Sequence, residues 1–281
     1  MMQKILFFIC FFAWVGIFHS LNAQNLQILQ KKHIQVEFLS EQASLVPGQN
    51  FWLAIRFQIE PHWHIYWQNP GDTGVPPSVK WILPEGIDAG PLLWPTPERI
   101  EDVSLVNYAY EGTVVFLIEM KSATTLSGDE VTLTAQVDWL VCKDICIHEG
   151  TSLSLKLPLK KELPELNSSE KILFEKARSK LPGRLPNWTF QAKMNLKSIV
   201  IDITPPADFS ETLLNLYFFP QEGGIIEDSA PQSVHKTETA YQLTLIRSIV
   251  VGKETPLLQG ILIFTQNEQK KTFQVQIPVS F

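Results

Sequence analysis

Two neighbouring stretches decide the fold: VTLTAQVDWLVC at residues 131–142 and CIHEGTSLSLKL at residues 146–157. Apolar and polar residues alternate along most of their length, starting with Val131 and Thr132. A two-residue period is typical of a strand that turns one face to a core and the other to water. We therefore expect two antiparallel strands joined by a short loop at residues 143–145.

The loop between these strands brings Cys142 and Cys146 together. Four residues of extended strand would separate their Cα atoms by about 13 Å. A disulfide needs a separation of about 4.4–6.8 Å, so the chain must turn between the two cysteines if they are to bond. A hairpin with Lys143-Asp144-Ile145 as its loop would place them opposite each other at bridging distance.

Side-chain parity predicts where the two sulfur atoms point. Cys142 has the parity of the polar residues Thr132 and Asp138, so we expect it to point away from the core. Cys146 and His148 are expected on the same outer face, with both sulfur atoms within reach of solvent. A reachable pair suits thiol–disulfide exchange.

Two other roles of the cysteine pair stay open at this stage. A structural disulfide is the first, although a bridge across so short a loop closes little chain and therefore stabilises little. Metal binding is the second, because thiolate and imidazole suit copper. Cys142, Cys146 and His148 would then be the ligands, and His62 and His64 are more distant candidates.

Residues 1–23 are expected to be a secretory signal that is cleaved before Gln24, with an uncleaved anchor as the alternative. Lys4 supplies a positive charge, and residues 6–18 are apolar. Cys10 would leave with the signal, so the hairpin pair would be the only thiols of the mature chain. No later stretch approaches the roughly 20 apolar residues that cross a bilayer. We expect an exported, soluble, periplasmic protein, in a compartment where disulfides persist.

Composition excludes some classes of function. The chain has 29 acidic against 23 basic residues and a net charge of −6, whereas nucleic-acid binding rewards clustered lysine and arginine. It has no phosphate-binding glycine loop and no serine-hydrolase motif. We expect no nucleic-acid partner and no cofactor.

The rest of the chain predicts a mostly β protein with two domains. Residues 24–162 would form the first domain and residues 163–183 a helical linker. Residues 184–281 would form a second sandwich with a structural or partner-binding role. The helix is expected at Ser168–Leu181, with Asn167 and Glu170 as its capping residues. Strands are expected at Phe51–Ile59, Val79–Leu83, Ile199–Ile203, Leu213–Phe219, Tyr241–Ile246, Ile261–Phe264 and Phe273–Val279. The prolines between Pro70 and Pro97 otherwise predict ordered loop there, because proline cannot donate to a ladder.

Three blocks of sequence resemble the DsbD/ScsB-like periplasmic N-terminal domain family of thiol:disulfide interchange proteins. HWHIYWQNPGDTG at residues 62–74 resembles the family's "GWHTYWRNPGDTG", although His62 stands where that block has glycine. YAYEG at residues 108–112 resembles "YGYEG", and WLVCKDIC at residues 139–146 resembles "WLVC…C". The resemblance extends in order over about residues 51–157.

The resemblance implies a fold and an activity. The N-terminal domain would be immunoglobulin-like. Together with the second sandwich expected from the sequence pattern, this gives an expected fold of two immunoglobulin-like β-sandwich domains joined by a short helical linker. Cys142 and Cys146 would be a redox pair that takes electrons from a membrane protein, often through a thioredoxin-like domain, and passes them to oxidised periplasmic proteins. The family's membrane and thioredoxin-like domains are not expected in this chain, so separate proteins would have to supply them. The family's ScsB-like branch is associated with copper tolerance.

Five other residues are expected to support the pair. Trp139 would pack in the core behind the hairpin, and Asp144 and His148 would flank the thiols. Tyr108 and Tyr110 would line the site, with simple packing as the alternative. A cap loop that shields the pair in the family is expected within residues 100–110.

Overall fold

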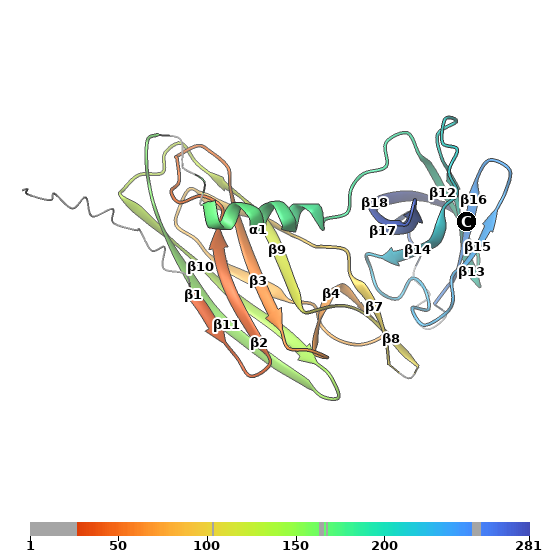
Figure 1. Cartoon of the computed structure of the whole chain (residues 1–281), viewed down its shortest axis with the longest axis horizontal. Coiled ribbons are helices and arrows are strands. Elements are labelled where there is room, and N and C mark those ends of the chain that lie inside the picture. The colour runs from red at the N-terminus through yellow and green to blue at the C-terminus, as the bar shows by residue number, and fades with distance from the viewer. Residues whose placement is uncertain (1–26, 103, 163–165, 167, 249–253) are drawn as a thin grey trace, which may run out of the picture.

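The computed structural model describes residues 27–102, 104–162, 166, 168–248 and 254–281 (Figure 1). The predicted signal at residues 1–23, the expected new N-terminus at Gln24 and the predicted cap at Asn167 lie outside the described residues. Among the described helices, none is long and apolar enough to span a bilayer.

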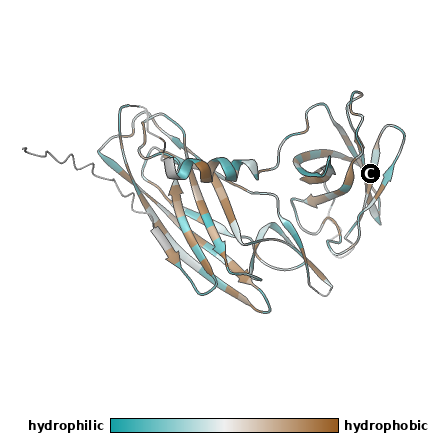
Figure 2. Cartoon of the chain, viewed as in Figure 1, coloured by the Kyte–Doolittle hydropathy of each residue, from teal (hydrophilic) through white to brown (hydrophobic). Residues whose placement is uncertain are grey.

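Strands β1–β11 build a sandwich of two sheets, which we call the N-terminal sandwich (Figure 1). One sheet has the order β1 (Gln27–Gln30), β2 (Ile34–Ser40), β3 (Phe51–Ile59), β9 (Thr113–Ser122), β6 (Ile87–Leu93). The other has the order β11 (Cys146–Pro158), β10 (Glu130–Cys142), β4 (His64–Gly71), β8 (Leu105–Glu111), β7 (Glu98–Asp102), and β5 (Ser78–Ile82) also pairs with β10. Apolar and polar residues alternate along the strands (Figure 2), which leaves one face of each sheet for a shared core.

The predicted hairpin is confirmed. β10 and β11 pair without interruption from Glu130 opposite Pro158 to Cys142 opposite Cys146. Val131, Leu133, Ala135, Val137 and Trp139 all point into the main core, as their parity predicts.

The prediction for the proline-rich segment is partly wrong. β5 lies where the short strand was expected, but β6 is a second strand within the same segment. Pro91 is tolerated because β6 is an edge strand, and because its register with β9 shifts between Ala89 and Leu92. Residues 100–102 and 104–110, where a cap over the pair was expected, lie in the β7–β8 hairpin, and Ile100 and Ala109 of this hairpin contribute to the cluster around Cys142.

The predicted helix is confirmed as α1 (Ser168–Ser179), which ends two residues before the predicted Leu181. It lies across the outer face of the five-stranded sheet, where Phe174 and Ala177 pack on Leu39, Ala54 and Leu117. Arg178 donates hydrogen bonds from both terminal nitrogens to the two oxygens of Glu41, each at 2.6 Å.

Strands β12–β18 form one seven-stranded sheet around a separate core, and we call this part the C-terminal sheet. Its order is β14 (Leu214–Pro220), β17 (Leu257–Gln266), β18 (Gln269–Ser280), β12 (Thr189–Met194), β13 (Ser198–Thr204), β16 (Tyr241–Ile246), β15 (Ser233–Lys236). All five strands expected here are present, while β12 and β15 were not predicted. The mostly β fold class is confirmed, whereas the proposed domain boundaries stay predictions.

The C-terminal sheet packs against the end of the sandwich that carries β4 and β8. Phe219, Ile261 and Ile263 belong to the same buried cluster as the core of the N-terminal sandwich. Tyr108 of β8 donates a buried hydrogen bond to Asp228 Oδ1 at 2.9 Å. Burial raises the pKa of Asp228 to about 6, against the lowering effect of the Tyr108 hydrogen bond.

Replacing Arg178 with alanine should lower the free energy of unfolding by about 1–3 kcal/mol, because it leaves the carboxylate of Glu41, only 8 % exposed, without its charged partner. Lys171 is the matched control on the same helix, since it forms an exposed pair with Glu175 at 3.9 Å. Lys171→Ala should cost less than about 0.5 kcal/mol. Urea unfolding measures the loss of unfolding free energy in each variant, and equal losses in Arg178→Ala and Lys171→Ala would contradict the prediction.

Asp228 should make stability depend on pH. Its pKa of about 6 in the folded protein exceeds the value of about 3.9 in an unfolded chain. The folded state therefore binds the proton more tightly, so the contribution of this group to stability falls as pH rises from about 4 to about 6 and stays low above that. Asp228→Asn keeps an oxygen acceptor for Tyr108 and should remove this decline, which amounts to at most about 3 kcal/mol.

Urea unfolding of the wild type and of Asp228→Asn at several pH values between 4 and 7.5 tests this expectation. Other carboxyl groups contribute equally to both proteins, so the difference between the two curves isolates Asp228. The groups that face it are Asp72, Glu227, Arg99 and the hydroxyl of Tyr108. Parallel curves would mean that Asp228 does not titrate in this window.

Candidate functional site

Cys142 and Cys146 form a disulfide at the end of the β10–β11 hairpin, with their Cα atoms 4.1 Å apart. Lys143 N donates to Ile145 O at 3.0 Å and closes the loop between them. The hairpin arithmetic therefore predicted both the turn and the facing positions of the cysteines.

The two sulfur-bearing residues differ in exposure. Cys146 is exposed, whereas Cys142 is only 1 % exposed. The parity argument is right that Cys142 points away from the main core, but the expectation that both sulfur atoms are reachable is wrong. A second small cluster covers Cys142, formed by Tyr66 and Ala109 with Ile100 and Leu140.

The cover over Cys142 comes from β4 and the β7–β8 hairpin. His64 of β4 lies directly opposite Cys142 in the ladder, and Tyr66 lies opposite Ala109 of β8. Parity reports which face a side chain occupies, but it carries no information about which strand lies next to it. No strand was predicted at residues 64–71, so the cover that β4 provides over Cys142 was not predicted.

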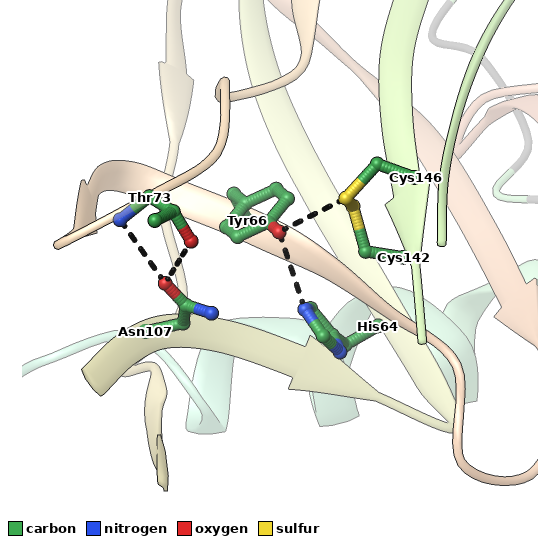
Figure 3. The surroundings of a disulfide bond; sticks show 6 residues. All are labelled: His64, Tyr66, Thr73, Asn107, Cys142 and Cys146. Carbon is green, nitrogen blue, oxygen red and sulfur yellow. Dashed lines mark hydrogen bonds between the residues drawn. A yellow bond between two sulfur atoms is a disulfide. The ribbon is translucent and has the colours of Figure 1, made fainter. Parts of the chain in front are cut away.

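The hydroxyl of Tyr66 contacts the disulfide (Figure 3). Its Oη lies 3.8 Å from Cys146 Sγ and 3.4 Å from His64 Nε2. The His64 and Tyr66 rings meet edge to face at 5.2 Å. Neither residue was predicted to support the pair, although both lie in the block at residues 62–74, two positions apart and therefore on one face of a strand.

Tyr66 keeps its proton at neutral pH. Burial raises the pKa of its hydroxyl, and a hydrogen bond with the side chain of Thr73 only partly offsets this effect. A neutral phenol can donate a hydrogen bond to sulfur, and such a bond favours the thiolate over the thiol once the disulfide is reduced.

The segment 69–74, which ends β4 and follows it, holds the Tyr66 ring in place. Gly74 has a φ of +104°, and a Cβ built on it would lie 2.2 Å from the ring, so its backbone rests directly on the phenol. Thr73 donates from its backbone nitrogen and its hydroxyl to Asn107 Oδ1 at 3.3 and 2.9 Å (Figure 3). Asp72 Oδ2 accepts a hydrogen bond from Val106 N at 2.7 Å. The segment is therefore tied to β8 next to the site.

The other expected supporting residues lie at varied distances from this centre. Trp139 is buried in the main core against Phe57, at a ring distance of 5.5 Å. Tyr110 donates to Pro95 O at 2.7 Å, and Tyr108 donates to Asp228. The structure thus engages both tyrosine hydroxyls away from the sulfur atoms, because both side chains share the inward parity of the main core.

Asp144 and His148 are exposed beside the disulfide, on the hairpin loop and on β11. Within the described residues, no group of three or more histidine, cysteine, aspartate or glutamate side chains is placed to hold a metal ion.

His62 has a φ of 70°, so a residue with a side chain takes the left-handed conformation at the position where the family block has glycine.

A family model matches residues 35–158, and its description is "Thiol:disulfide interchange protein DsbD, N-terminal". No match was found among curated proteins.

Among solved structures, the N-terminal periplasmic domain of ScsB from Proteus mirabilis is similar with a TM-score of 0.66 at 18 % identity, covering 91 % of this chain and 98 % of that one. The yeast GGA1 GAE domain matches with a TM-score of 0.27 at 12 % identity over 46 % of this chain and 97 % of that one. The periplasmic chaperone SfaE matches with a TM-score of 0.23 at 10 % identity over 86 % and 98 %. The last two values are too low to support an argument, whereas the first shows a shared fold. Residues 35–158 of this chain therefore match the model of the DsbD N-terminal family, and the chain shares the fold of the ScsB N-terminal periplasmic domain.

Proposed function

We propose that the Cys142–Cys146 disulfide is a working redox centre that exchanges electrons with partner dithiols in the periplasm. The observation that carries the proposal is the asymmetry of the pair, with Cys146 exposed and Cys142 buried beneath Tyr66. Exchange requires in-line attack on one sulfur, and a single accessible sulfur decides which one is attacked. The family match supports the same type of chemistry.

The exchange runs through Cys146. A thiolate of a reduced partner attacks Cys146 Sγ, the Cys142–Cys146 bond breaks, and Cys142 leaves with the electron pair as a thiolate. The partner's second thiolate then attacks its own sulfur in the mixed disulfide and releases Cys146. The partner has become a disulfide, and the pair has gained two electrons and takes up two protons as its thiolates are protonated.

Reduction of a target protein follows the same path in reverse. The Cys146 thiolate attacks the target disulfide and forms a mixed disulfide, and Cys142 attacks Cys146 Sγ to resolve it. Tyr66 Oη is placed to donate to Cys146 Sγ and to stabilise its thiolate. We assign the donor role to a membrane electron-transfer protein or a thioredoxin-like protein, and the target role to oxidised periplasmic proteins.

A structural disulfide is the main competing role, and the reduction potential separates the two. Equilibration of the purified protein with graded thiol buffers should give a potential between about −300 and −120 mV, the range of thiol–disulfide oxidoreductases. A bond that stays closed below about −300 mV would make the pair a structural bridge. The chain would then be a non-catalytic interaction module.

The order of attack predicts different behaviour for two serine variants. With a thioredoxin-like protein whose single active-site cysteine is held in a mixed disulfide with a small thiol, the Cys146 thiolate of Cys142→Ser should displace that thiol and form a stable adduct. Cys146→Ser should form the adduct at least about tenfold more slowly, because the thiol of Cys142 is buried. Non-reducing electrophoresis with timed quenching measures both rates. Equal rates, or faster reaction of Cys146→Ser, would contradict the assignment of Cys146 as the attacked sulfur.

A further inference from the structure

β4 and β8 each serve two clusters, because successive residues of a strand point to opposite faces. On one face, Tyr66 and Ala109 cover Cys142. On the other face, Trp67 and Tyr108 contact Phe219 of the C-terminal sheet, at ring distances of 6.3 and 4.9 Å. The strands that cover the disulfide are therefore the same strands on which the C-terminal sheet packs.

Asn69 joins the C-terminal sheet to the segment that holds Tyr66. Its side chain is only 1 % exposed. Its Nδ2 donates to Pro220 O of β14 at 2.8 Å, while its Oδ1 accepts a hydrogen bond from Gly71 N at 3.1 Å. A Cβ built on Gly223 would lie 3.1 Å from the same Oδ1, so the C-terminal sheet fits closely around this amide.

A continuous series of contacts therefore leads from the C-terminal sheet to the sulfur. Pro220 O binds Asn69, Asn69 binds Gly71 within the segment 69–74, and Gly74 of the same segment rests on the Tyr66 ring. Tyr66 Oη then reaches Cys146 Sγ. Apart from the short covalent stretch between Gly71 and Gly74, each step is a hydrogen bond or a close contact, and Asn69 and Tyr66 are both buried.

We propose that Asn69 is a positioning residue through which the docked C-terminal sheet holds the Tyr66 hydroxyl against Cys146, so that docking sets the reactivity of the pair. This proposal rests on the redox function proposed above and assigns the C-terminal sheet a role in it. When the Asn69–Pro220 contact is lost, the segment 69–74 is released on one side, and Tyr66 is no longer held in a fixed position. The hydrogen bond to Cys146 then weakens, and the Cys146 thiol is ionised to a smaller extent.

Asn69→Asp is the sharpest variant for the test. It keeps the oxygen that accepts from Gly71 N, but it replaces the donor to Pro220 O by a second oxygen. Asn215→Asp is the matched control, because it makes the same change on β14, where Asn215 is exposed and donates to Thr265 Oγ1. Phe219→Ala weakens the same interface from the C-terminal side, so the test does not depend on a single substitution.

The measurement is the rate of alkylation of reduced protein by iodoacetamide as a function of pH, which gives the pKa of the Cys146 thiol. Asn69→Asp and Phe219→Ala should raise that pKa and slow alkylation at pH 7 by about two- to tenfold, the effect of losing one hydrogen bond. Asn215→Asp should leave both unchanged. Tyr66→Phe should give the same shift, and adding Asn69→Asp to Tyr66→Phe should give no further shift, because the two act through one hydrogen bond.

Two results would overturn the proposal. One is a thiol pKa in Asn69→Asp and Phe219→Ala that equals that of Asn215→Asp. The other is an equal shift from Asn69→Asp with and without the Tyr66 hydroxyl, which would indicate a direct effect of the added charge. A wild-type reduction potential in the structural range would instead overturn the redox function, so the two failures are distinguishable.

Discussion

The pairing of β4 with β10 is the constraint on which the site depends. It sets His64 opposite Cys142 and brings Tyr66 over the disulfide. Without this neighbour, the end of β10 would be an open hairpin with two exposed sulfur atoms. With it, the sulfur of Cys142 belongs to a buried cluster, whereas Cys146 is exposed.

Burial of Cys142 also affects the energetics of exchange. A thiolate that leaves into an apolar cluster is less stable than one in water, because desolvation disfavours the charged form. Tyr66 provides a nearby donor that keeps its own proton, since burial raises the pKa of its hydroxyl. The same cluster therefore shields one sulfur from attack and supplies a hydrogen-bond donor to the other.

The sequence predicts those parts of the site that depend on local geometry. Alternation along residues 131–141 gives the strand, and the distance between Cys142 and Cys146 requires the turn. The burial of Cys142 could not be predicted in this way, because it depends on which strand lies beside β10. Tyr108 and Tyr110 were expected near the sulfur atoms, but a block of sequence shared with a family does not tell on which face of β8 they lie. β6 was missed because the argument from proline does not account for an edge strand with a shift in register.

The segment 69–74 shows why a stretch that reads as loop in the sequence can be a structural joint. Asn69 serves the C-terminal sheet, Asp72 and Thr73 bind β8, and Gly74 lies against Tyr66. Each residue type follows from its contact: an amide that both donates and accepts, a carboxylate and a hydroxyl for neighbouring polar groups, and a glycine where a Cβ would meet an aromatic ring. Because Phe219, Ile261 and Ile263 complete the core of the N-terminal sandwich, the C-terminal sheet is more than an appendage beyond a linker. It closes one end of the sandwich, and the segment 69–74 runs from that end toward the disulfide. Residues of this segment therefore serve both the packing of the C-terminal sheet and the surroundings of the disulfide.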